Sequence, residues 1–167
     1  DIIVPVVGWA TTYFPITQNG FKINFVDVDP DTWNIDVDKI EAAITPNTCA
    51  IMAVNLLGNS CDYNKIVEIC EKHNLKLIED NCESMGAKHN KSYTGTIGLA
   101  GSFSFFFSHH IQTMEGGMVL CKNKDDAEPR HPSLNSLCAS SSVEEIAAAL
   151  ISAVDKSSAP AVPEAPA

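Results

Sequence analysis

The sequence predicts an α/β fold in which a mostly parallel sheet carries helices on both faces. Short runs rich in Val, Ile and Phe alternate along the chain with segments of helical periodicity. Most of these runs are continuously apolar, as strands buried on both faces are. Strand, helix and strand in repetition build a parallel sheet, and ligands bind such sheets beyond the carboxyl ends of the strands. The residues that follow each strand are therefore the ones to search for function.

Six segments are predicted to be strands because they are short, apolar and bounded by turn-forming residues. They are residues 1–7, 22–28, 49–54, 76–79, 102–106 and 117–121. Two further segments, 36–44 and 64–74, have apolar residues at the three- and four-residue spacing of a helix face. Asp36 and Asp62 stand where helix N-caps are expected, and Asn74 stands where the second helix should end.

The composition indicates one soluble, cytoplasmic domain. With 167 residues, of which 45% are hydrophobic, the chain can bury one substantial core. Its formal net charge of −10 argues against binding to nucleic acid or to anionic membranes. No apolar run approaches the roughly twenty residues of a membrane span. The six cysteines include no CxxC pair, which favours reduced thiols.

Three regions are expected along the chain. Residues 1–126 hold all the predicted strands and form the ligand-binding domain. Residues 127–156 differ in character and contain one short amphipathic helix at 143–154. Residues 157–167 are rich in Ala and Pro, have no apolar face to bury and are expected to be disordered. Because the chain starts directly on a strand, we expect an upstream part to be missing.

Asp80 is the first candidate functional residue, because it follows the predicted strand 76–79 directly. A carboxylate in that place can hold a heteroaromatic ring nitrogen in its protonated, electron-withdrawing form. The alternative is that Asp80 caps a helix beginning at Cys82. Position alone does not decide between the two interpretations.

The segment 102–118 carries hydroxyls, two adjacent histidines and a Glu-Gly-Gly turn. Serine hydroxyls beside this turn could bind a phosphate, and a histidine could move protons near neutral pH. The alternative is a pair of surface histidines beside a hairpin. We predict no metal site, because His109 and His110 would point to opposite faces of a strand and no third ligand has suitable spacing.

Trp9 follows the first strand and a glycine, so its indole could stack on a flat ring. A lone aromatic residue more often belongs to the core, and the sequence alone favours that second interpretation.

Together these segments resemble the DegT/DnrJ/EryC1/StrS family of pyridoxal-phosphate-dependent nucleotide-sugar aminotransferases. The resemblance covers residues 1–126 and includes the acidic pair Glu79-Asp80 and the Glu-Gly-Gly of residues 115–117. It implies a truncated large domain with the type I, aspartate aminotransferase-like fold.

One departure from the family pattern suggests the activity. In ordinary members the fifth residue after the phosphate-binding serine is the lysine that holds the cofactor; counted from Ser104, that residue is His109. The exchange resembles the sugar 3-dehydratase branch and implies non-covalent pyridoxal or pyridoxamine 5'-phosphate, with His109 as the acid-base catalyst. The resemblance also implies that Trp9 stacks on the ring, Asp80 contacts its nitrogen, Glu83 lies near its hydroxyl and Ser104 holds the phosphate.

The resemblance implies 3-dehydration of a nucleotide-linked 4-keto-6-deoxy sugar, as in the synthesis of lipopolysaccharide O-antigen. Glutamate would be the amino donor, His110 would have a supporting role, and an intact enzyme would be a homodimer. An iron-sulfur cluster, which a related branch uses, is not expected because only Cys121 and Cys138 follow His109. An aminotransferase and a non-catalytic remnant remain as alternatives.

Overall fold

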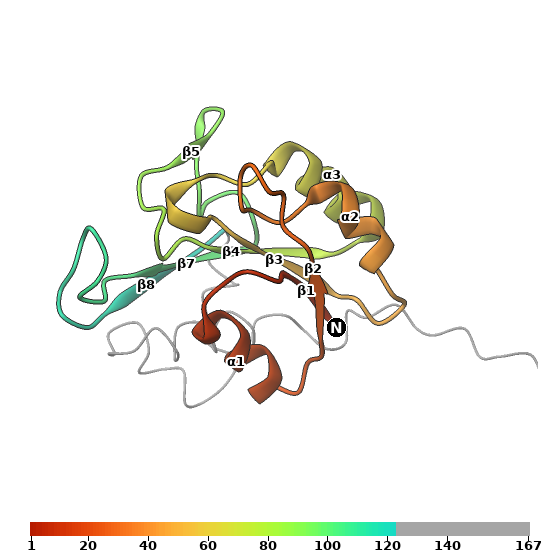
Figure 1. The fold of residues 1–167 in the computed structure, drawn as a ribbon, viewed down its shortest axis with the longest axis horizontal. Helices are drawn as coiled ribbons and strands as arrows, with labels where there is room; N and C mark the ends of the chain where they lie inside the picture. The colour runs from red at the N-terminus through yellow and green to blue at the C-terminus, as the bar shows by residue number, and fades with distance from the viewer. Residues whose placement is uncertain (123–167) are drawn as a thin grey trace, which may run out of the picture.

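The structure, a computed structural model, describes residues 1–122. The predicted helix at 143–154, the tail at 157–167 and the boundary at residue 126 lie outside the described residues. A six-stranded sheet forms the centre of the fold (Figure 1). Its strands, in spatial order, are β2 (Ile23–Val26), β1 (Ile2–Pro5), β3 (Ala50–Val54), β4 (Lys76–Asp80), β7 (Ala100–Ser104) and β8 (Gly117–Cys121).

The first five strands in this order are parallel, and β8 pairs with β7 in the antiparallel direction. All six predicted strands are present, so the mostly parallel sheet is confirmed. The prediction for β7 was displaced by two residues, because the apolar residues Phe105 and Phe106 continue beyond the end of pairing at Ser104. A separate hairpin of β5 (Lys88–His89) and β6 (Ser92–Tyr93) was not predicted.

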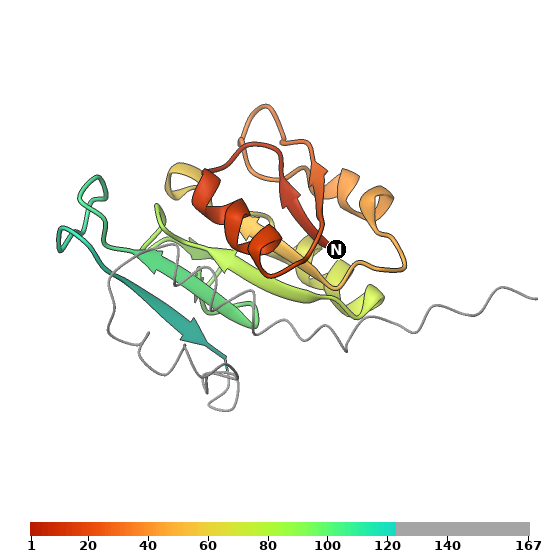
Figure 2. The ribbon, with the colours of Figure 1, turned by 90° about the horizontal axis from the view of Figure 1, so that it is seen from below.

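Helices cover both faces of the sheet, as predicted. Helix α1 (Ala10–Gln18) lies on one face, while α2 (Val37–Ile40), the short 3-10 turn Glu41–Ala43 and α3 (Tyr63–His73) lie on the other (Figures 1 and 2). Each face has its own apolar core, because successive strand residues point to opposite sides. The α1 side buries Ile2, Val4, Ile16, Ala50, Met52 and Ile78, and the other side buries Ile3, Ile40, Ile51, Ile66 and Leu77.

The caps of α2 and α3 agree with the sequence. The Asp36 carboxylate accepts a hydrogen bond from the backbone N–H of Asp38, and Asp62 accepts one from Lys65. Asn74 ends α3 in the left-handed conformation, with φ of 52°. Helix α1 was missed because it has no side-chain cap, no charge in its first or last turn, and a proline inside it.

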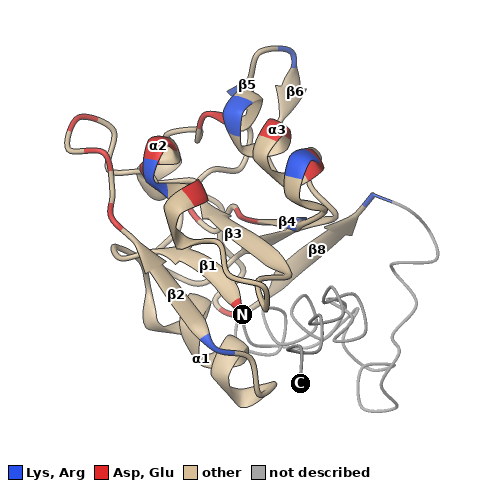
Figure 3. Cartoon of the chain, turned by 90° about the vertical axis from the view of Figure 1, so that its right-hand side faces the viewer, with Lys and Arg blue, Asp and Glu red and all other residues tan. Residues whose placement is uncertain are grey.

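Charged residues gather along α2 and α3 (Figure 3). Lys65 pairs with Asp38 at 2.8 Å, and Lys72 pairs with Glu41 at 2.7 Å. These pairs are exposed and contribute little to stability. Within residues 1–122, no helix combines the length and the apolar character that crossing a membrane requires.

Candidate active site

A pocket of about 550 Å³ lies at the carboxyl ends of β1, β3, β4 and β7. This is the edge where a parallel α/β sheet is expected to bind ligands. The segment that joins β7 to β8 extends beyond the sheet (Figures 1 and 2) and contributes Phe106, Ser108, His109 and Glu115 to the pocket lining. The pocket is lined by Val7, Gly8, Trp9, Thr11, Thr12, Val54, Asn55, Leu56, Asp80, Cys82, Glu83, Ser104, Phe106, Ser108, His109 and Glu115. All five residues singled out for catalysis or cofactor binding belong to this lining.

Asp80 ends β4 with its carboxylate at the pocket wall and only 9% of its surface exposed. One carboxylate oxygen, Oδ1, accepts a hydrogen bond from the backbone N–H of Cys82 at 3.1 Å. The other, Oδ2, accepts one from the hydroxyl of Thr12 at 2.8 Å. No helix begins at Cys82, so the interpretation of Asp80 as a helix cap is wrong, although its carboxylate does order the turn that follows.

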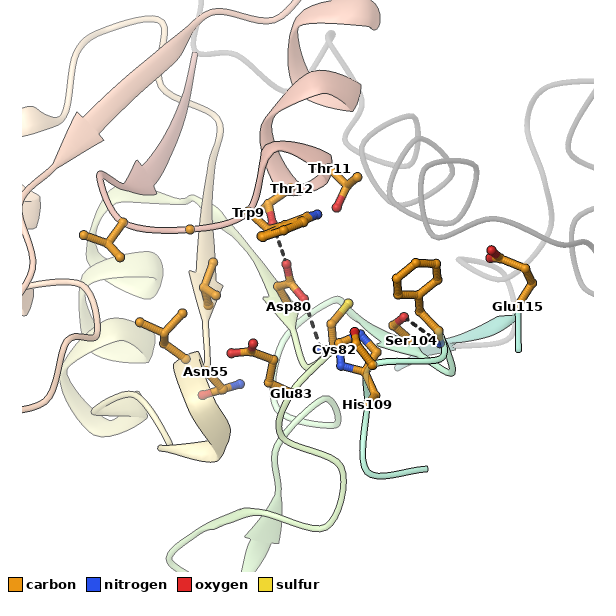
Figure 4. A pocket seen from close by; sticks show the side chains of 16 residues that line it. Trp9, Thr11, Thr12, Asn55, Asp80, Cys82, Glu83, Ser104, His109 and Glu115 are labelled. Carbon is orange, nitrogen blue, oxygen red and sulfur yellow. Dashed lines mark hydrogen bonds between the residues drawn. The ribbon is translucent and has the colours of Figure 1, made fainter. Parts of the chain in front are cut away.

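Trp9 is the N-cap residue of α1, and 75% of its surface is exposed. The core interpretation of this tryptophan is therefore wrong. In Figure 4 the indole lies across Asp80 from Glu83 and His109, and its high exposure leaves it accessible from the pocket.

Ser104 ends β7 and is 5% exposed. Its Oγ accepts a hydrogen bond from the backbone N–H of Phe106 at 3.2 Å. Because a hydroxyl both accepts and donates, the side chain can still donate a hydrogen bond toward the pocket.

The two histidines have different environments, and neither lies on a strand. His109 is partly buried in a turn, where its backbone N–H bonds the carbonyl of Phe106 at 3.0 Å and its ring stands edge-on to the Phe106 ring. His109 lines the pocket, whereas His110 is exposed and is not part of the lining. The surface interpretation therefore fits His110 alone.

Glu83 connects the pocket to the loop after β3. Its Oε2 accepts a hydrogen bond from the backbone N–H of Leu57 at 2.7 Å. Leu57 has a left-handed backbone, with φ of 53°, which a leucine adopts only when its surroundings hold it. The same loop is held by a second hydrogen bond, which Asn34 Oδ1 accepts from the backbone N–H of Leu56 at 3.2 Å.

Among the pocket residues that were not singled out from the sequence, Thr12 and Asn55 have opposite characters. Thr12 bonds Asp80 directly, but it lies in the helix that had not been predicted. Asn55 reaches the pocket wall with its amide already committed: Nδ2 donates to the hydroxyl of Tyr63 and to Asn81, and Oδ1 accepts from the backbone of Cys61. Asn55 is thus a structural residue with 1% exposure.

Glu79, the other member of the acidic pair, is fully buried and lies on the opposite side of the sheet from Asp80. Its carboxylate accepts three backbone hydrogen bonds, from Gly95 at 2.6 Å, Ile97 at 2.7 Å and Gly98 at 2.6 Å. Glu79 therefore fixes the segment that leads into β7 and makes no contact with the pocket.

Two groups near Asp80 stay uncharged at neutral pH. Burial, with the nearby Asp80 charge, raises the pKa of Tyr13 to about 12. Burial and the same charge also hold the pKa of the Cys82 thiol far above its usual range. Asp80 consequently faces no competing charge from these neighbours. Within residues 1–122, no three His, Cys, Asp or Glu side chains form a group that could hold a metal ion.

The fold and the pocket define an α/β domain that presents a carboxylate, an exposed indole and a histidine at the carboxyl edge of its sheet. The profile of the DegT/DnrJ/EryC1/StrS aminotransferase family matches residues 1–142, and the chain belongs to this family.

Curated relatives include the GDP-4-keto-6-deoxy-D-mannose 3-dehydratases of Yersinia pseudotuberculosis and Escherichia coli O55:H7. They are 55% and 50% identical to the chain over 131 residues, which is 78% of the chain and 33% of each relative. The chain thus spans about a third of the length of these curated relatives.

Solved structures of related enzymes also match the fold of the chain. A crystal structure of a GDP-4-keto-6-deoxymannose-3-dehydratase mutant with bound GDP-perosamine matches with a TM-score of 0.71 and 49% identity, over 74% of the chain and 32% of that protein. An aminotransferase from Psychrobacter cryohalolentis matches with a TM-score of 0.73 and 26% identity, over 91% of the chain and 45% of that protein. These neighbours confirm the predicted type I fold.

Proposed function

We propose that the chain forms the cofactor-binding and proton-transfer part of a pyridoxal-phosphate-dependent 3-dehydratase that acts on a nucleotide-linked 4-keto-6-deoxy sugar. The observation that carries the proposal is the pocket that Asp80 shares with His109, which no lysine of residues 1–122 lines. The two 3-dehydratases of 55% and 50% identity support it.

The pocket residues fit the cofactor in size and chemistry. A volume of about 550 Å³ is within the range of pockets for small molecules. The exposed indole of Trp9 suits a flat ring, Asp80 suits a protonated ring nitrogen, and the Ser104 hydroxyl suits a phosphate oxygen. The carboxylate of Glu83 has one oxygen beyond its bond to Leu57 and would lie near the ring hydroxyl. When bound as pyridoxamine phosphate, the cofactor supplies an amine for the 4-keto group and a ring that accepts electrons.

His109 is the acid-base residue in this proposal. An imidazole can accept and release a proton near neutral pH, but it cannot form the stable covalent bond to the cofactor that a lysine forms. The His109 ring removes a proton within the pocket and delivers a proton to the departing 3-hydroxyl oxygen of the sugar. Asp80 would keep the ring nitrogen protonated, and the Trp9 indole, which lines the pocket, would cover one face of the ring.

The remaining parts of the proposal concern partners and cellular setting. Glutamate restores the amine form of the cofactor; a relative of 49% identity was crystallised with a trapped pyridoxal phosphate-glutamate geminal diamine. A nucleotide sugar is the substrate, a homodimer is the assembly, and the cytoplasm is the location. A relative of 42% identity is a lipopolysaccharide biosynthesis protein of Salmonella typhimurium, in line with a role in O-antigen synthesis.

A sugar aminotransferase is the second candidate. GDP-perosamine synthases from Caulobacter vibrioides and Escherichia coli O157:H7 are 41% and 42% identical to the chain. The two candidates differ in product: a dehydratase releases a 3-deoxy-4-keto sugar and ammonia, whereas an aminotransferase leaves the amine on the sugar.

The deciding variant is His109→Asn in the protein that carries this chain. Asparagine preserves approximate size but cannot transfer a proton, so release of 3-deoxy sugar should fall about a hundred- to ten-thousandfold while pyridoxal phosphate still binds. The comparable variant His73→Asn, on α3 and outside the pocket lining, should be as active as the wild type. Near-normal turnover of His109→Asn would remove His109 from the mechanism.

A chemical test separates the two candidates without turnover. The chain is incubated with pyridoxal phosphate, reduced with borohydride and analysed by peptide mass spectrometry. We expect no reduced cofactor on any residue. A stable adduct on a lysine, for example Lys88 or Lys91, would show that a displaced lysine holds the cofactor and would favour the aminotransferase.

A further inference from the structure

We infer that Thr12 is a positioning residue, which holds the Asp80 carboxylate against the cofactor's ring nitrogen and sets its place relative to the Trp9 indole. The inference rests on the proposed function and deepens it. It starts from a buried contact between residues 68 positions apart, the bond from the Thr12 hydroxyl to Asp80 Oδ2 at 2.8 Å.

The bond to Thr12 completes the fixation of the carboxylate. The Cys82 backbone N–H holds Oδ1, and the Thr12 hydroxyl holds Oδ2, so the carboxylate plane cannot turn without breaking a hydrogen bond. Thr12 is 4% exposed and Asp80 is 9% exposed, so water has little access to replace either partner. A bond between a charged and a neutral group in such a place is stronger than one in solvent.

Thr12 also joins two of the proposed cofactor contacts. It lies in the first turn of α1, three residues after Trp9, and its backbone N–H bonds the Trp9 carbonyl at 3.0 Å. Through its side chain it contacts Asp80 at the end of β4. One residue therefore links the helix that presents the indole face to the strand that presents the nitrogen partner, as Figure 4 shows.

Two opposing effects of removing the hydroxyl can be told apart. Without a donor on Oδ2, the carboxylate becomes a better proton acceptor, which would raise the proton affinity of a bound ring nitrogen. It also becomes free to turn toward the open pocket, which would lengthen its contact with that nitrogen and lower the affinity. Positioning predicts a lower proton affinity, because Asp80 lines a pocket of about 550 Å³ into which a released carboxylate can turn.

The test uses the full 167-residue chain with pyridoxal phosphate that is isotope-labelled at the ring nitrogen. Thr12→Val removes the hydroxyl at nearly constant volume, and Thr12→Ser keeps it. For Thr12→Val we expect about tenfold weaker cofactor binding and about tenfold lower proton affinity of the ring nitrogen, read from its NMR shift against pH. Thr12→Ser should stay within about threefold of the wild type in both.

A matched control is Thr17→Val, in the same helix, where the hydroxyl donates to the carbonyl of Phe14 and makes no other hydrogen bond within residues 1–122. It should leave both quantities unchanged. If Thr12→Val does not fold, as judged by circular dichroism, Thr12→Ala replaces it with the same expected result.

The outcomes separate the inference from the function on which it rests. Wild-type binding with an unchanged or higher nitrogen proton affinity in the folded Thr12 variant would overturn the positioning role and leave the proposed function standing. A wild-type chain that binds no pyridoxal phosphate would overturn both. Equal losses in Thr12→Ser and Thr12→Val would also overturn the inference, because they would report packing and not the hydroxyl.

Discussion

Glu79 and Asp80 are neighbours in the chain and have the same chemistry, yet they serve different regions of the molecule. Glu79 points to the α3 side of the sheet, where three backbone N–H groups occupy its carboxylate. Asp80 points to the α1 side, where two donors hold it and the pocket remains open in front of it. Both are almost completely buried.

The difference shows that burial of a carboxylate does not by itself identify a functional group. The hydrogen-bond partners of the carboxylate distinguish a structural role from a functional one. Backbone donors that close around a carboxylate make it part of the fold, as at Glu79. Donors that hold a carboxylate from the side and leave one direction open make it part of a site, as at Asp80. The variants below test this contrast, beginning with the largest expected effect.

Glu79→Gln should destabilise the fold strongly with no specific effect on ligand binding. Ile97 and Gly98 donate to one carboxylate oxygen and Gly95 to the other, so the amide NH₂ of glutamine must face at least one of these backbone N–H donors. We expect the free energy of unfolding to fall by about 3 kcal/mol, measured by urea denaturation. The same change at the exposed Glu68 should stay within about 0.5 kcal/mol. A loss at Glu79 no larger than at Glu68 would contradict the structural role.

Asp80→Asn should show the reverse pattern. Asparagine still offers an oxygen to Thr12 or to Cys82, so the unfolding free energy should change by less than about 1 kcal/mol. The ring nitrogen loses its charged partner, so we expect at least about tenfold weaker binding of pyridoxal phosphate, measured by fluorescence titration. Asp31→Asn removes the same charge outside the pocket and should bind normally. Unchanged binding in Asp80→Asn would remove the functional half of the contrast.

Tyr13 gives a spectroscopic test, with a smaller expected effect, of which side of the sheet the Glu79 and Asp80 charges face. Its pKa is raised to about 12 by burial first and by Asp80 second. Any stability that depends on the protonated phenol is therefore present below pH 10 and is lost as the pH rises toward 12. The titration of Tyr13 is followed by phenolate absorbance and is assigned as the transition that Tyr13→Phe lacks. Asp80→Asn should move this transition to lower pH. Removing the Glu79 charge should not move it to lower pH.

Most of the sheet could be predicted because buried parallel strands are continuously apolar, and the Asp36 and Asp62 caps made two helices recognisable. Helix α1 could not be predicted, because its threonines, aromatic residues and internal Pro15 disfavour a helix locally. Packing of residues such as Ile16 against the sheet overrides that preference. The direction of β8 was also not recognisable, because an apolar strand has the same pattern in either direction.

The candidate site likewise contains residues that could be predicted from the sequence and residues that could not. Asp80 was found because it directly follows a predicted strand, and its place in the fold follows from that strand. Ser104 lies within the predicted strand 102–106, and its role came from the family resemblance. Thr12 could not be found, since its partner is 68 residues away and its helix was unrecognised. The split between Glu79 and Asp80 could be anticipated only in that neighbouring strand residues face opposite sides.

The Glu79 contacts also bear on the order in which the chain folds. Its three donors lie 16 to 19 residues along the chain, whereas the pairing of β1 with β3 joins Ile2 to Ala50, 48 residues apart. Closing the shorter loop costs roughly 0.9 kcal/mol less chain entropy. We therefore expect β4, the β5–β6 hairpin and the start of β7 to assemble first, with β1 docking later. In stopped-flow kinetics, Glu79→Gln should then mainly slow folding, while Ile2→Val should mainly speed unfolding.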